Sequence, residues 1–82
     1  MPRSPVVSGR DLIKMMTGMG YEVVRRRGSH VRLRKATPAG VHNITVPDHD
    51  EMARGTLNDI LSSTSLWNSI PKEDLIKMLR GV

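Results

Sequence analysis

The amino-acid sequence predicts an α+β fold in which one helix is followed by a three-stranded antiparallel sheet and two further helices. Two observations predict this order. Apolar residues recur at helical spacing towards both ends of the chain, and two β-prone runs in its middle are separated by a glycine and a serine. The chain has 82 residues, of which 38% are apolar, so we expect one domain over residues 1–82 with a modest core. The helices should cover one face of the sheet.

The first predicted helix spans about Gly9–Met19. Ser8 before it is a suitable N-cap, Asp11 follows three residues later as in a capping box, and Gly20 supplies a stop. Five apolar residues at helical spacing should face the core: Leu12, Ile13, Met15, Met16 and Met19. Residues 1–7, which include two prolines, are expected to form a loose arm.

Two strands are predicted over Tyr21–Arg27 and His30–Lys35. The Gly28-Ser29 pair between them is typical of a two-residue type II′ hairpin turn. Such a turn places Arg27 opposite His30, and directly opposed residues share a face of the sheet. One face should then carry Val23, Arg25, Arg27, His30, Arg32 and Arg34, with Val23 opposite Arg34. The other face should pack on the helix and carry Val24, Val31 and Leu33, with Arg26 near the tip.

The second half of the chain completes the predicted order. A loop over Lys35–Gly40 leads to a third strand over Val41–Val46, whose Ile44 and Val46 should face inward. An acidic connection over Asp48–Ala53 precedes a second helix from about Arg54 to Ser62. After a polar stretch, an added C-terminal helix is predicted over about Pro71–Arg80, because Pro71 suits a first helical turn. Its apolar stripe consists of Leu75, Ile76, Met78 and Leu79.

Positive charge is concentrated in the first half of the sequence. Residues 1–42 hold nine Lys/Arg and two Asp/Glu, whereas residues 43–82 hold four Lys/Arg and six Asp/Glu. The whole chain has a formal charge of +5. Such a patch attracts polyanions because binding releases counterions condensed on phosphates; a merely solvated basic face is the alternative. The predicted RNA-binding residues are Arg25, Arg27, Arg32, Arg34 and Lys35. With Tyr21 and Trp67 as the only aromatic residues, recognition through phosphates is favoured over base stacking.

Several other chemistries do not fit the sequence. Without cysteine there is neither a disulfide framework nor a thiolate metal site. The three histidines lack His-x-x-x-His spacing, and no glycine-rich phosphate loop occurs, so no metal and no cofactor is expected. No apolar run has the length of a signal peptide or a membrane span, and we therefore expect a cytoplasmic protein without membrane contact.

Four short motifs follow one another between about Val6 and Ser63. They are Val7-Ser8-Gly9-Arg10-Asp11-Leu12-Ile13-Lys14, Gly20-Tyr21-Glu22-Val23-Val24-Arg25-Arg26-Arg27-Gly28-Ser29-His30, Thr45-Val46-Pro47-Asp48-His49, and Gly55-Thr56-Leu57 with Ile60-Leu61. In this order they resemble the HicA (YcfA-like) toxin family. The resemblance implies a double-stranded-RNA-binding-domain-like fold and an endoribonuclease that cleaves mRNA, and because no metal motif occurs we expect this cleavage to be metal-independent. It also implies a HicB-type antitoxin as partner and His30 as the catalytic residue. The sequence departs from the family in its added C-terminal helix and in a longer Lys35–Gly40 loop.

An imidazole beside arginines suits RNA cleavage chemically. Imidazole can take the proton of a 2′-hydroxyl near neutral pH, while arginines hold the charge that grows on the phosphate. A second acid or base is not identified on this face, and His49 is the candidate if its loop folds back. Two rival functions stay open, a non-catalytic RNA- or DNA-binding module and a protein whose basic face docks an acidic partner. The apolar stripe of the last helix is assigned to protein contact, as a homodimer or with the antitoxin.

Overall fold

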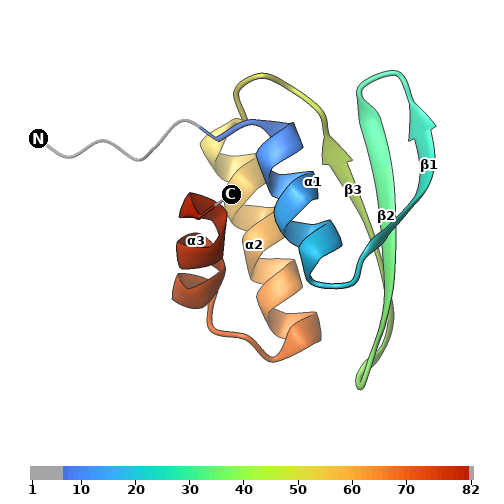
Figure 1. Ribbon diagram of the computed structural model, residues 1–82, viewed down its shortest axis with the longest axis vertical. Helices are drawn as coiled ribbons and strands as arrows, with labels where there is room; N and C mark the ends of the chain where they lie inside the picture. Colours follow the sequence, from blue (N-terminus) through green and yellow to red (C-terminus); the bar gives the residue numbers. More distant parts are fainter. Residues whose placement is uncertain (1–6, 82) are drawn as a thin grey trace, which may run out of the picture.

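The computed structural model describes residues 7–81 as a layer of helices packed on one face of a three-stranded sheet (Figure 1). The elements are α1 (Gly9–Gly18), β1 (Glu22–Arg27), β2 (His30–Thr37), β3 (Gly40–Pro47), α2 (Arg54–Asn68) and α3 (Lys72–Arg80). This confirms the predicted α+β class and the order of the elements. Most of the predicted N-terminal arm lies outside the described residues; its last residue, Val7, is buried, and its carbonyl accepts a hydrogen bond from the Met52 N–H at 2.7 Å.

The first hairpin has the predicted turn. The strand order is β1-β2-β3, with both pairs antiparallel, and Arg27 lies opposite His30 and Arg25 opposite Arg32 as expected. Gly28 has a φ of 58°, and Ser69 is the single non-glycine residue within 7–81 with a positive φ. The φ of Ser29 is therefore negative, which agrees with a type II′ turn and excludes type I′.

Further along β1, a β-bulge shifts the predicted register. The pairing slips between Val23 and Arg25, so that Val23 lies opposite Leu33 and Glu22 opposite Arg34. The prediction that Val23 faces Arg34 is therefore wrong, because a bulge places two residues of one strand against one of its neighbour. The predicted inward packing of Val24 is also wrong, since its side chain is 48% exposed.

The second hairpin is tighter and longer than predicted. Strand β2 continues to Thr37 and strand β3 begins at Gly40, so only two residues join them. The predicted Lys35–Gly40 loop is therefore wrong. The Thr37 hydroxyl closes this turn by donating to the Gly40 carbonyl at 2.7 Å and accepting from the Ala39 N–H at 3.2 Å. The extended hairpin projects past the ends of the helices at the bottom of Figure 1. Ile44 and Val46 face the helices as predicted, opposite Leu33 and Val31.

The second helix has 15 residues and is longer than expected. It runs to Asn68 instead of ending near Ser62, and it stops where Ser69 adopts a left-handed conformation with a φ of 54°. The additional turns contribute Thr64, which is fully buried, to the helix face that packs on the sheet. Tertiary contacts therefore outweigh the weak helix propensity of the serine-rich segment.

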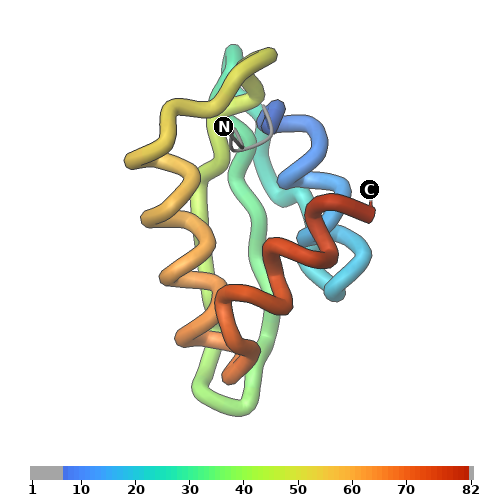
Figure 2. The backbone as a smooth tube through the Cα atoms, turned by 90° about the vertical axis from the view of Figure 1, so that its left-hand side faces the viewer, coloured from blue at the N-terminus to red at the C-terminus, as the bar shows by residue number. Residues whose placement is uncertain are grey.

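The last helix belongs to the core. Figures 1 and 2 show α3 lying against both α1 and α2 on their side away from the sheet. Leu75 is completely buried, Leu79 is buried, and Ile76 packs against the same cluster. The apolar stripe that the sequence assigned to protein contact is therefore used inside the domain, apart from the partly exposed Met78. No helix within residues 7–81 is long and apolar enough to cross a membrane.

Candidate functional site

The outer face of the sheet, turned away from the helices, carries the predicted cluster of positive charge. In β2 burial alternates, with Val31 and Leu33 fully buried and His30, Arg32 and Arg34 exposed. The side chains on the outer face, hereafter the cationic face, are Arg25, Arg27, His30, Arg32 and Arg34. The structure therefore brings together five of the six residues that the hairpin pattern predicted to share a face, and the bulge removes the sixth, Val23.

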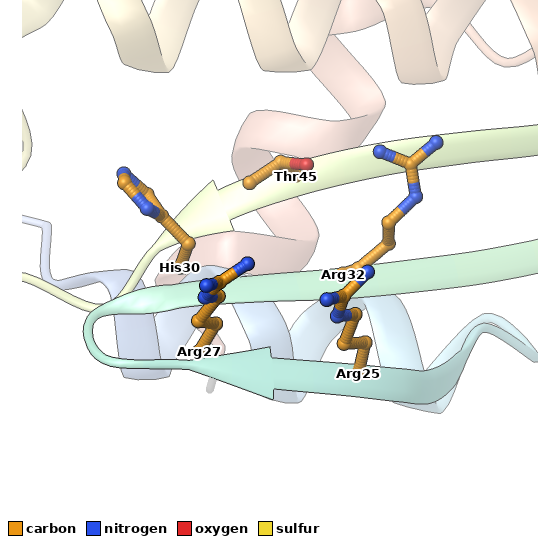
Figure 3. A pocket seen from close by; sticks show the side chains of 5 residues that line it. All are labelled: Arg25, Arg27, His30, Arg32 and Thr45. Atoms are coloured by element: carbon orange, nitrogen blue, oxygen red, sulfur yellow. The ribbon is translucent and has the colours of Figure 1, made fainter.

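Four of these residues and one from β3 line a shallow, open depression of about 310 Å³. Its lining residues are Arg25, Arg27, His30, Arg32 and Thr45. In Figure 3 their side chains rise from the same side of the three strands, with Arg27 and His30 beside the turn and Arg25 and Arg32 further along. Thr45 was not among the predicted site residues, although it stands between the inward-facing Ile44 and Val46 and alternation could have found it.

The charge of this face is not neutralised within the described part of the chain. None of the four arginines forms a hydrogen bond or an ion pair with a side chain of residues 7–81. The nearest acidic residue along the sheet is Glu22, which lies opposite Arg34. Exposed guanidinium groups without a carboxylate partner are free to bind phosphate, often through two parallel hydrogen bonds.

His30 is the first residue of β2 and lies between Arg27 on one neighbouring strand and Pro47 on the other. Its side chain is exposed, and no residue within 7–81 forms a hydrogen bond or an ion pair with it. Both ring nitrogens therefore face the depression or solvent and are available to a ligand. The catalytic role that the family resemblance implies for His30 is compatible with this position.

Lys35 lies on the other face of the sheet from the arginines. Its ammonium group donates to Asn68 Oδ1 at 2.6 Å and lies 5.7 Å from the centre of the Tyr21 ring. Lys35 is half-buried on the inner face. Successive residues of a strand point to opposite faces, so the residue after the outward-facing Arg34 points inward. The structure therefore does not bring Lys35 together with the predicted RNA-binding arginines.

His49 follows β3 in the connection to α2. Its side chain is exposed and does not line the depression, and its carbonyl accepts a hydrogen bond from the Gly9 N–H at 2.8 Å. The neighbouring Asp48 N–H donates to the Ser29 carbonyl at 2.6 Å, so this segment does return to the turn. The structure thus places the backbone of His49 near the site without bringing its imidazole into it.

A buried polar network that the sequence did not reveal ties the inner face of the sheet to the end of α2. Lys35 donates to Asn68, and Asn68 Nδ2 donates to the Tyr21 hydroxyl at 2.8 Å. The Tyr21 hydroxyl is hydrogen-bonded to His42 Nδ1 at 2.6 Å, and His42 Nε2 is hydrogen-bonded to the Ser63 hydroxyl at 3.0 Å. Because the lysine can only donate, it fixes the orientation of the Asn68 amide.

Burial perturbs the titration of the two rings in this network. Desolvation lowers the pKa of His42 and raises the pKa of the Tyr21 hydroxyl. The His42 ring is 3% exposed and stacks on Trp67 with centroids 5.1 Å apart and planes 9° from parallel. These contacts lie on the opposite face from His30, so the network fixes the scaffold and does not contribute to the depression.

The fold and the depression define a small α+β protein with an exposed, unneutralised cationic sheet surface and a single accessible histidine within it. A family model described as the HicA toxin of bacterial toxin-antitoxin matches residues 9–66, which is more than half of the chain. The chain belongs to the HicA toxin family and is a toxin of a toxin–antitoxin system, which implies an antitoxin partner. Neither a search of curated proteins nor a search of solved structures gave a match.

Proposed function

We propose that this toxin is an endoribonuclease that cleaves mRNA without a metal ion, with His30 as the general base. The observation that carries the proposal is an imidazole with both nitrogens available, set among exposed arginines in one depression. No group of three His, Asp or Glu side chains that could hold a metal occurs within residues 7–81. In this proposal the imidazole transfers the proton, and the guanidinium groups stabilise the charge on the phosphate.

The proposed reaction uses the 2′-hydroxyl of the RNA as nucleophile. His30 takes the proton of this hydroxyl, and the oxygen attacks the neighbouring phosphorus while the bond to the 5′-oxygen breaks. Arginines of the cationic face hold the phosphoryl oxygens as their negative charge grows, and the leaving 5′-oxygen takes a proton from water. The products are a 2′,3′-cyclic phosphate and a 5′-hydroxyl end.

The RNA backbone binds along the cationic face through Arg25, Arg27, Arg32 and Arg34. Neighbouring strands lie about 4.8 Å apart, and alternate residues of one strand lie about 6.6 Å apart, so the four guanidinium groups form a grid. Such a grid can contact several successive phosphates of one strand. Lys35 is left out of this surface because its ammonium group is bound to Asn68 on the other face.

The partner of the toxin is, in this proposal, a HicB-type antitoxin, and the setting is the cytoplasm, where mRNA is found. The family membership supports an antitoxin partner. The charge of the cationic face makes the same surface attractive to an acidic protein segment as to RNA. A self-associated toxin is not part of the proposal, because the stripe that suggested it is packed inside the domain.

The proposal is tested with a labelled RNA and a matched oligonucleotide in which every 2′-hydroxyl is replaced by hydrogen. We expect both to bind, only the RNA to be cut, and its products to end in 2′,3′-cyclic phosphate, all in the presence of a chelator. Binding of both without cleavage of either would leave a non-catalytic RNA-binding module. Cleavage of the deoxy strand, or loss of cleavage in chelator, would refute the mechanism.

A further inference from the structure

The position of the His30 side chain depends on the backbone beside it. No side chain within residues 7–81 holds the imidazole by a hydrogen bond, and the preceding turn contains Gly28, a residue type that tolerates many conformations. A reacting group must be held close to its productive geometry, and a misplacement of about 1 Å can cost about 10²-fold in rate. Contacts that fix the turn therefore bear directly on the proposed activity.

Asp48 makes two such contacts. Its backbone N–H donates to the Ser29 carbonyl at 2.6 Å. The preceding residue, Pro47, lies opposite His30 and has no N–H to donate. Its carboxylate Oδ2 accepts from Arg26 Nη1 at 3.1 Å. One residue at the end of β3 is thus bound both to the turn and to the strand that leads into it.

The segment that carries Asp48 is itself held firmly. The Gly9 N–H at the start of α1 donates to the His49 carbonyl at 2.8 Å. The Gly9 Cα also packs so closely that a Cβ there would lie 2.1 Å from the Pro47 oxygen. The first helix therefore fixes the end of β3, and the end of β3 in turn holds the hairpin turn.

The Arg26–Asp48 ion pair differs from the Arg10–Asp50 pair in how far its carboxylate is shielded from water. The Asp48 side chain is 18% exposed, whereas Asp50, which pairs with Arg10 at 3.3 Å, is 95% exposed. Shielding from water strengthens the first pair, while a fully solvated pair contributes little. Arg26 also lies opposite Val31, an inward-facing residue, and so outside the cationic face.

We infer that Asp48 and Arg26 are positioning residues, which hold the Gly28-Ser29 turn and thereby the imidazole of His30 over the depression. The inference rests on the proposed function and deepens it. It gives one of the three consecutive arginines of β1 a role different from that of its neighbours, because Arg25 and Arg27 bind phosphate while Arg26 fixes the turn.

The test compares Asp48→Ala with Asp50→Ala. Both variants remove one negative charge from the same connection, so any general change in RNA attraction is shared between them. We measure kcat and KM for cleavage of a labelled RNA, with the folded state checked by circular dichroism. Amide hydrogen exchange at residues 28–30 is measured by NMR on the protein without RNA. Asp48→Ala should lower kcat about 10-fold at a KM within about twofold of that of Asp50→Ala, and the turn amides should exchange faster.

Variants of Arg26 provide the second arm. Arg26→Ala should repeat the loss in kcat, Arg26→Lys should restore most of it by keeping a cation, and the double variant with Asp48→Ala should be no worse than either single one. Equal kcat and equal exchange in the two aspartate variants would overturn the inference. So would an Arg26→Ala effect confined to KM, since that indicates a phosphate contact. If the wild type does not cut RNA, the proposed function fails, and the exchange comparison alone decides whether Asp48 fixes the turn.

Discussion

Replacing arginines of the cationic face should flatten the salt dependence of RNA binding in proportion to the number removed. Each contact between an arginine and a phosphate of a single strand contributes about 0.7 to the slope of log affinity against log salt. Four exposed arginines without partners among residues 7–81 then predict a slope near −3, and affinity should fall about 50-fold between 50 and 200 mM salt. Arg32→Ala should reduce the slope to about −2, and Arg32→Ala with Arg34→Ala to about −1.4.

Lys35→Ala is the matched control, because it removes the same charge from a neighbouring position of β2. Its ammonium group is bound to Asn68 on the inner face, so the slope should stay near −3. Binding is measured by fluorescence anisotropy of a labelled RNA over a salt series, with an RNA that is not cut on the time scale of the measurement. An unchanged slope in the double arginine variant, or an equal effect of Lys35→Ala, would show that RNA binds elsewhere.

Two further predictions concern the scaffold. Leu75→Ala should lower the free energy of unfolding by about 2–5 kcal/mol, because Leu75 is completely buried between α3 and the rest of the core, whereas Met78→Ala on the exposed side should cost within about 0.5 kcal/mol. Urea unfolding measures both, and equal effects would mean that α3 is not part of the core. Burial lowers the pKa of His42, so as pH falls the imidazole is protonated in the unfolded chain before it is protonated in the folded protein. The free energy of unfolding should therefore be at its full value above pH ~6.5, the usual histidine pKa, and should decrease as pH falls from there towards the pKa of the folded state. In His42→Gln this decrease between pH 5 and 7 should be smaller than in the wild type. An identical pH profile of stability in the wild type and His42→Gln would show that His42 does not cause the decrease.

Local patterns were sufficient to predict the first hairpin and the residues of its charged face. The Gly28-Ser29 pair specifies a two-residue turn, and such a turn fixes the pairing of Arg27 with His30 without any knowledge of the rest of the chain. The bulge at Val24 was not predictable in this way, because period-two counting assumes that every residue has one partner. Alternation alone would have placed Lys35 on the inner face; its inclusion among the RNA-binding residues came from counting charges.

The second half of α2 was missed for a different reason. The serine-rich stretch after Leu61 has no strong helical preference, and its helix is stabilised by contacts that are distant in sequence. Asn68 and Ser63 bond to Tyr21 and His42, respectively, on the sheet. The partners in this network are separated by 21 positions (Tyr21 and His42) or 47 positions (Tyr21 and Asn68), so their contacts leave no periodic signal in the sequence. The same holds for the Arg26–Asp48 pair, whose partners are 22 positions apart.

The proposed cleavage depends most on the imidazole of His30, and one comparison of variants tests this dependence directly. The rate of cleavage of a labelled RNA is measured for His30→Ala and for His49→Ala, which removes an exposed imidazole outside the depression. We predict that His30→Ala lowers the rate about 10²–10⁴-fold while RNA affinity and the free energy of unfolding stay within about 0.5 kcal/mol of the wild type. His49→Ala should cleave nearly as fast as the wild type. Undiminished cleavage by His30→Ala would contradict the catalytic role of His30 and leave only an RNA-binding surface.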